Sequence, residues 1–173
     1  MKFEQFTNIN ELTEWMNIAK LAGLKSTEFV ENEVKESILN VTNTNDKNSI
    51  TNNTINLNIG IAYCMRNQDN KIIGTSFLKQ IEEYDSSNQI TIFHIAIDET
   101  LRGQGLGKQL MNETFKCAKR LKLSFANLYT TTQSNFYLNC GMKKYGEFPD
   151  LIKTKQNKKF SRKYLYINLD TIN

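Results

Sequence analysis

Hydrophobic residues recur along the chain at two spacings, and these predict a succession of strands and helices. Apolar positions three and four residues apart predict helices at 10–22, 26–40, 105–121 and 133–139. Alternating or continuous apolar runs predict strands at 1–6, 57–66, 71–84, 89–98, 124–130, 142–148 and 160–169. The order of these elements predicts an α/β domain with a mixed central sheet of about six to seven strands, flanked by about four helices.

The segment 40–58 interrupts this pattern. Twelve of its 19 residues are Asn or Thr, so it cannot bury enough apolar surface to form a core. It also holds eight of the 22 Asn residues in the chain. We expect a long Asn/Thr-rich loop there, inside a single domain that covers residues 1–173. Two interpretations of this segment remain open. It is either a loop that becomes ordered when a substrate binds, or an insertion without a function.

Length and composition narrow the class of protein. A chain of 173 residues is long enough for one hydrophobic core and too short for two. It contains no run of about 18 apolar residues, and its first residues do not resemble a signal peptide. Its cysteines, Cys64, Cys117 and Cys140, match no metal-binding or disulfide spacing. We therefore expect a cytoplasmic protein with no metal ion and no membrane segment.

Positive charge is concentrated late in the chain. Residues 143–163 carry eight Lys or Arg and two acidic residues, in a chain whose net charge is +4. A basic segment can bind nucleic acid. More often such a segment is a solvated surface loop, so we do not expect a nucleic-acid partner.

A glycine-rich turn follows the apolar strand at 89–98. It reads Arg102-Gly103-Gln104-Gly105-Leu106-Gly107-Lys108 and leads into a predicted helix. Glycine lets backbone N–H groups approach a ligand closely, and a helix N-terminus favours negative charge. The two cationic side chains add to this preference. The turn is typical of a pyrophosphate site, although its spacing fits neither a P-loop nor a Rossmann fingerprint.

The spacing Arg102-x-x-Gly105-x-Gly107 resembles the R/Q-x-x-G-x-G/A motif of the GNAT superfamily of N-acetyltransferases. The apolar strand at 89–98 resembles the central strand of that family. The order of predicted elements along residues 1–170 is similar to that of the GNAT fold.

A second stretch, about 30 residues later, extends the resemblance. Phe136, Tyr137 and Gly141 match the family's F-Y-x-x-x-G-F helix end, with Met142 in place of the final aromatic residue. Two motifs in the right order make the resemblance specific.

The resemblance implies that an acetyl group passes from acetyl-CoA to an amine. It implies that the glycine turn holds the pyrophosphate through Arg102, Gly103, Gln104, Gly105, Leu106, Gly107 and Lys108. The pantetheine arm would pair with the strand at Ile95 and Ile97, and Phe136 and Tyr137 would also contact the cofactor. The backbone N–H of Ile97 would polarise the thioester carbonyl.

Tyr137 is the implied general acid. A phenol with a pKa of about 10 is protonated at neutral pH and can protonate the leaving thiolate. A packed tyrosine at a helix end is the alternative.

No general base is obvious. His94, the only histidine, has a suitable pKa, but strand alternation places it with Ile92 and Ala96, opposite Ile95. A core histidine is therefore the preferred interpretation, unless a β-bulge changes the alternation. Glu83, in the preceding strand, could act through water or attract a cationic amine, and a solvated carboxylate is the alternative.

Two functions from different classes stay open. One is an N-acetyltransferase acting on a primary amine of a small molecule, peptide or protein. The other is a non-catalytic acyl-CoA-binding module of the same fold, acting as a sensor or interaction domain. The resemblance leaves undecided which amine is the acceptor and whether the protein is a monomer or a homodimer.

Overall fold

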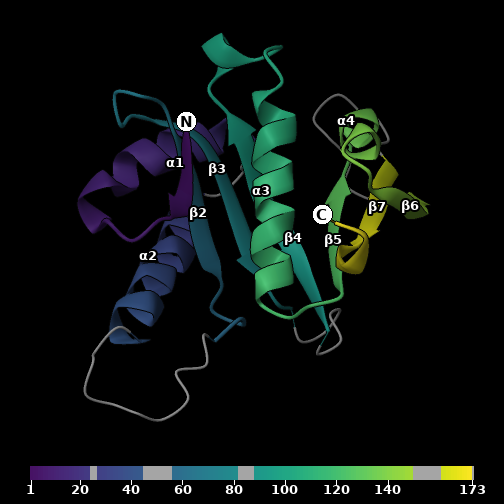
Figure 1. The fold of residues 1–173 in the computed structure, drawn as a ribbon, viewed down its shortest axis with the longest axis horizontal. Coiled ribbons are helices and arrows are strands. Elements are labelled where there is room, and N and C mark those ends of the chain that lie inside the picture. Colours follow the sequence, from purple (N-terminus) through teal and green to yellow (C-terminus); the bar gives the residue numbers. More distant parts are fainter. Residues whose placement is uncertain (24–26, 45–55, 82–87, 150–160, 173) are drawn as a thin grey trace.

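A seven-stranded mixed β-sheet runs through the molecule in the computed structural model (Figure 1). The strand order is β1-β2-β3-β4-β5-β7-β6. The strands are β1 (Lys2–Gln5), β2 (Ile61–Arg66), β3 (Ile72–Lys79), β4 (Gln89–Ile97), β5 (Phe125–Thr130), β6 (Lys143–Pro149) and β7 (Ser161–Asn168). Neighbouring strands are antiparallel except β4 and β5, which are parallel. The structure describes residues 1–23, 27–44, 56–81, 88–149 and 161–172.

Helices lie on both faces of this sheet. On one face are α1 (Leu12–Lys20) and α2 (Thr27–Thr44), and on the other is α3 (Leu106–Arg120), which makes the crossover between β4 and β5 (Figure 1). The short α4 (Ser134–Asn139) packs beside β7. The described residues thus form a single α/β domain with seven strands and four α-helices, which confirms the predicted fold class.

Alternation along β2 divides the hydrophobic core between the two faces. Ile61 and Tyr63 pack with α3, whereas Ala62 and Cys64 pack with α1 and α2. Trp15 of α1 is fully buried, and its Nε1 donates to the carbonyl of Tyr63 at 2.9 Å. This hydrogen bond fixes α1 directly to the backbone of the sheet.

The first two helices depart from the predicted boundaries. Asn10 was expected to begin the first helix, but a 3-10 turn occupies Ile9–Glu11, capped by the side chain of Asn8. The second helix continues to Thr44, so the prediction that a loop begins at residue 40 was wrong. Asn and Thr cost only tenths of a kcal/mol each in a helix, so a helix anchored by packing continues through them. The rest of that predicted loop, 45–55, lies outside the described residues.

Two strands are shorter than predicted. β2 begins at Ile61 rather than residue 57, because Gly60 has a left-handed backbone with φ of +96°. A Cβ at Gly60 would also lie 2.5 Å from the ring of Phe77. β3 ends at Lys79, and residues 82–87, with Glu83 among them, lie outside the described residues.

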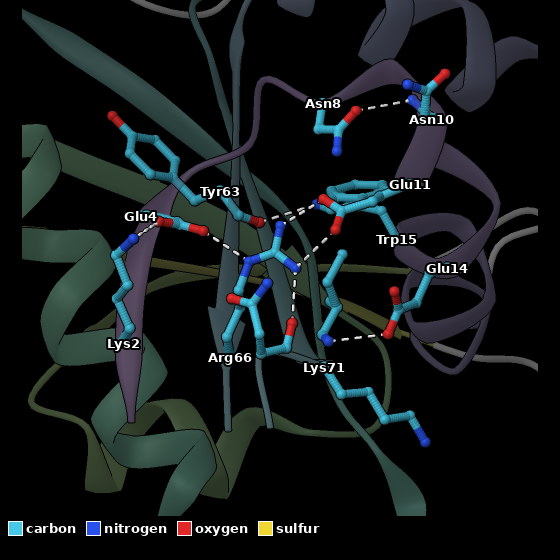
Figure 2. Close-up of polar contacts among 12 residues, drawn as sticks. Lys2, Glu4, Asn8, Asn10, Glu11, Glu14, Trp15, Tyr63, Arg66 and Lys71 are labelled. Atoms are coloured by element: carbon cyan, nitrogen blue, oxygen red, sulfur yellow. Dashed lines mark hydrogen bonds and ion pairs between the residues drawn. The ribbon is translucent and has the colours of Figure 1, made fainter. Parts of the chain in front are cut away.

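Arg66, at the end of β2, is the centre of a buried ion-pair network, shown in Figure 2. Its Nε donates to Glu4 and its Nη2 to Glu11, both at 2.6 Å, and its Nη1 donates to the carbonyl of Asn70 at 2.9 Å. The Arg66 side chain is 7% exposed and each carboxylate is 26% exposed. Lys2 forms a further ion pair with Glu4. The network holds β1 and the turn before α1 against the central sheet.

Replacing Arg66 by Ala should lower the free energy of unfolding by about 3 kcal/mol, because it leaves two partly buried carboxylates without their partner. Urea titration at pH 7 measures this. The matched control is Lys35→Ala, which breaks an exposed pair with Glu31 on α2 and should cost at most about 0.5 kcal/mol. Equal losses in the two variants would contradict a structural role for the network.

Candidate active site

The central sheet is open between β4 and β5 after their first three residue pairs. Residues 89–91 pair with 125–127, and the side-chain hydroxyl of Thr91 donates to Oδ1 of Asn127 at 2.7 Å at the last pair. Beyond this point β4 continues to Ile97 and β5 to Thr130 without further pairing between these two fully described strands. The backbone of β4 therefore faces an opening in the sheet.

Ile97 presents its backbone polar groups to this opening. The N–H of the next residue, Asp98, donates to the carbonyl of Ile73 on the β3 side at 2.9 Å. Because backbone groups alternate in direction along a strand, the N–H and C=O of Ile97 point the other way. The Nε of Arg102 donates to that carbonyl at 3.4 Å, which agrees with this direction. The N–H expected to contact a thioester thus lies at the opening.

A β-bulge interrupts β4 at His94. Ala96 is opposite Thr75 while Phe93 is opposite Phe77, so two residues of β4 face one residue of β3. His94 has a left-handed backbone, with φ of +53°. Its carbonyl accepts a hydrogen bond from the side-chain hydroxyl of Thr75 at 2.9 Å, which holds the bulge in place.

The bulge decides on which face of the sheet the His94 side chain lies. Ile92 packs on the α3 face, whereas the His94 ring lies 5.8–6.3 Å from the rings of Trp15, Phe77 and Phe93 on the opposite face. The prediction that His94 and Ile92 share a face was wrong, because it assumed unbroken alternation. Burial lowers the pKa of His94 to about 4, so the imidazole is neutral at pH 7.

The glycine turn leads from β4 into the N-terminus of α3. Gly103 and Gly105 have φ of +79° and +80°, which is the left-handed region that glycine adopts readily. Gly105 is the N-cap residue of α3, and no side chain among the described residues caps this end. Gln109 has the first backbone N–H that forms a helical hydrogen bond, which it donates to the Gly105 carbonyl at 3.1 Å. The N–H groups before it are available to an anion.

The two sequence motifs contact each other through Gly107. A Cβ at this position would lie 3.1 Å from the ring of Phe136, so the missing side chain lets α3 and α4 approach. Phe136 packs edge-to-face with Tyr137 at 5.0 Å. After α4, Gly141 has φ of +93°, and the N–H of Met142 donates back to the Tyr137 carbonyl at 3.2 Å. This is a Schellman motif, which explains the glycine.

Tyr137 lies partly buried against the core, as do Ile95 and Phe136. Burial, with a smaller contribution from the neighbouring Cys140, raises the pKa of Tyr137 to about 12. The phenol is therefore protonated at neutral pH. Burial also raises the pKa of the Cys140 thiol, which makes this cysteine a poor nucleophile.

A cleft of about 550 Å³ lies on the α2 side of the bulge. Apolar and aromatic side chains in its wall are Phe29, Val30, Ile81, Phe93, His94 and Tyr129. Its charged side chains are Glu33 and Lys79, which pair at 2.6 Å. The rings of Phe93 and Tyr129 meet at 6.4 Å, so the cleft reaches the opening between β4 and β5. The sequence alone does not reveal this cleft, because its residues come from five separate stretches of the chain.

The predicted site residues divide between the two faces. Ile95, Ile97, Phe136 and Tyr137 and the turn 102–108 surround the opening or pack on its α3 side. Within the turn, Arg102, Gln104 and Lys108 are exposed, whereas Leu106 is buried. His94 lies on the opposite face, at the cleft. Glu83 is outside the described residues.

No metal site is evident in the described part of the chain, where no three His, Cys, Asp or Glu side chains come together. The helices described there include none that is both long and apolar enough to cross a membrane. The three cysteines are free and buried.

Comparison with known proteins agrees with this geometry. Residues 60–144 match the family model for an acetyltransferase (GNAT) domain. These residues hold the bulged strand, the glycine turn and the tyrosine of α4, and this part of the chain is a GNAT acetyltransferase domain. A search of curated proteins finds no match.

Solved structures share the fold along the whole chain. A GNAT-family protein from Desulfovibrio desulfuricans is 10% identical, with a TM-score of 0.73, and the match covers 97% of this chain and 98% of that one. A Bacillus subtilis acetyltransferase in complex with CoA is 18% identical, with a TM-score of 0.67 and coverage of 96% and 97%. A variant of spermidine N-acetyltransferase from Vibrio cholerae is 14% identical, with a TM-score of 0.69 and coverage of 99% and 97%. At these identities the likeness shows the fold.

The partly buried, neutral His94 should make stability depend on pH. Its pKa is about 4 in the folded state and 6.5 when exposed, so the unfolded state takes up the proton first as the pH falls. The free energy of unfolding should therefore decrease by about 2 kcal/mol between pH 7 and pH 5 through this residue. Asn tolerates the left-handed backbone, so His94→Asn should fold, and this decrease in the free energy of unfolding should be absent in the variant. Urea titration at the two pH values measures it, and an equal decrease in the variant would contradict the assignment.

Proposed function

We propose that the protein is an N-acetyltransferase that moves the acetyl group of acetyl-CoA to a primary amine. The observation that carries this proposal is the unpaired edge of β4, which ends at an uncapped helix N-terminus behind a glycine turn. An extended amide-containing chain that ends in a pyrophosphate matches both features. It pairs with backbone groups along a strand and presents its negative charge to N–H groups.

The turn 102–108 holds the pyrophosphate in this proposal, chiefly through N–H groups at the start of α3. Arg102 and Lys108 lie exposed beside it and supply positive charge. Ile95 and Ile97 offer backbone groups to the pantetheine arm, and Phe136 packs behind the turn against Gly107. When bound, acetyl-CoA supplies an activated acyl group as a thioester.

Three groups carry the transfer step. A neutral amine forms a C–N bond to the thioester carbonyl carbon while the Ile97 N–H stabilises the negative charge on the carbonyl oxygen. The C–S bond then breaks, and Tyr137 donates its phenolic proton to the thiolate. The amine releases its extra proton to water. The high pKa of Tyr137 keeps it in the proton-donating form at the start of each cycle.

The acceptor class is open between small amines and amino groups of peptides or proteins. One structural neighbour is named a spermidine N-acetyltransferase, so small amines are the first group to screen.

We propose a cytoplasmic location, supported by three buried thiols without disulfides. For the oligomeric state, a monomer and a homodimer are both retained.

One observation favours the second candidate, a binding module without turnover. The only histidine, His94, is partly buried and has a pKa of about 4, so it is a weak base. Acetyl-CoA binding with no CoA release across a broad amine screen, in the wild type and in Tyr137→Phe alike, would establish this candidate.

Tyr137→Phe should lower kcat by at least about 100-fold, because it removes the proton donor while keeping the packed ring. CoA release from acetyl-CoA measures the rate, and calorimetry should show unchanged acetyl-CoA affinity. The control is Tyr145→Phe, which removes the hydroxyl of a tyrosine that is 79% exposed on β6 and should leave kcat unchanged. A fully active Tyr137→Phe would exclude Tyr137 as the acid.

Gly105→Ala should weaken acetyl-CoA binding by about tenfold. The left-handed backbone costs a residue with Cβ about 1–2 kcal/mol, and relaxation of this strain displaces the N–H groups of α3. Gly23→Ala is the matched control, since Gly23 has φ of +81° and equal space for a Cβ but lies at the end of α1. Calorimetric titration with acetyl-CoA measures the affinity of each variant. Equal affinities of Gly105→Ala and Gly23→Ala would show that the turn is not part of the acetyl-CoA site.

A further inference from the structure

We infer that the acceptor is an amine attached to an aromatic or similarly bulky apolar group, and that this group binds in the cleft between α2 and the opening of the sheet. The inference rests on the proposed acetyl transfer and names the substrate class for it.

Aromatic rings from three elements surround the cleft. Phe29 comes from α2, Phe93 from β4 and Tyr129 from β5. Phe93 and Tyr129 meet edge-to-face at 6.4 Å, and Tyr164 of β7 continues the row at 6.0 Å from Tyr129. Rings prefer such edge-to-face contacts at 4.5–7 Å, so an aromatic ligand finds suitable partners on several sides.

Charge in the described wall of the cleft is balanced. Glu33 and Lys79 are both partly buried and are paired with each other at 2.6 Å. A polyamine carries several ammonium groups and needs a carboxylate near each of them, because an unpaired ammonium in apolar surroundings is costly. The described wall presents Glu33 as its one carboxylate, and Lys79 already neutralises it. The wall is therefore better suited to an acceptor with one amine and an apolar body.

The same surroundings favour the reactive form of that amine. Apolar walls disfavour an ammonium ion and lower its pKa, so a larger fraction of the bound amine is neutral and nucleophilic. His94, on the cleft wall, is itself neutral at pH 7 and adds no repelling charge. Phe93 of β4 and Tyr129 of β5 form the inner wall of the cleft beyond the last β4–β5 pair, so an amine bound there faces the same opening as the proposed thioester.

The size of the cleft agrees with a small acceptor. Its volume of about 550 Å³ is within the range of small-molecule sites, about 300–1,000 Å³. A ring of six carbons with a two-carbon amine chain fits such a space.

Phe29 gives a test that leaves the core intact, because this side chain is 63% exposed. Phe29→Ala should raise the KM for 2-phenylethylamine about fivefold, since it removes one aromatic contact, and should leave kcat and acetyl-CoA affinity unchanged. The matched control is Leu39→Ala, which shortens a side chain that is 61% exposed on the same helix but outside the cleft wall. It should change none of these values.

The choice of substrate tests the inference directly. CoA release should show kcat/KM at least about tenfold higher for 2-phenylethylamine than for butane-1,4-diamine or spermidine. A preference for either polyamine would overturn the inference. Equal effects of Phe29→Ala and Leu39→Ala on KM would also overturn it.

A non-reactive probe separates this inference from the proposed function. 2-Phenylethanol has the shape of 2-phenylethylamine but lacks the amine, and its binding can be followed by NMR titration. Binding that Phe29→Ala weakens, together with no acetylation of any amine, would support the cleft assignment and contradict the acetyltransferase. Acetylation of amines without detectable 2-phenylethanol binding would contradict the cleft assignment and leave the acetyltransferase intact.

Discussion

The separation of β4 from β5 beyond the hydrogen bond between Thr91 and Asn127 is the constraint on which the rest of the site depends. Backbone N–H and C=O groups inside a protein need partners, and strands in a sheet normally provide them. Here the pairing stops in the middle of the sheet, so the backbone of β4 has an open side up to Ile97. A ligand with amide groups can supply the missing strand contacts.

The bulge at His94 and the glycine turn belong to the same arrangement. The bulge adds a residue to β4 and turns His94 toward α1 and α2, while Ile95 and Ile97 pack on the α3 face. The glycine turn then carries the chain from the open strand into the N-terminus of α3. In the proposed reaction, the cofactor and the acceptor would therefore approach one point from opposite sides of the sheet.

A rigid frame supports this opening. α1 is fixed to the sheet by the hydrogen bond from Trp15 to the Tyr63 carbonyl, and Arg66 joins β1 and the turn before α1 to the end of β2 (Figure 2). On the other face, the Thr114 hydroxyl of α3 donates to Ser76 of β3 at 3.0 Å. These contacts to β2 and β3 keep the helices in place on both faces of the sheet.

The sequence by itself determined the order of elements, the position of the glycine turn and the end of α4. These are local features: apolar periodicity reports which side of an element is buried, and glycine at 103, 105 and 141 is needed where φ is positive. Each can be recognised within a short window of residues.

Only the tertiary structure decided the face of His94, the extent of α2 and the existence of the cleft. The bulge arises from the register between β3 and β4, which strand alternation within β4 does not encode. α2 continues to Thr44 because packing of its earlier turns outweighs the weak preference of Asn and Thr against helix. Phe29, Phe93 and Tyr129 lie far apart along the chain, and they form one wall only because the fold brings α2, β4 and β5 together.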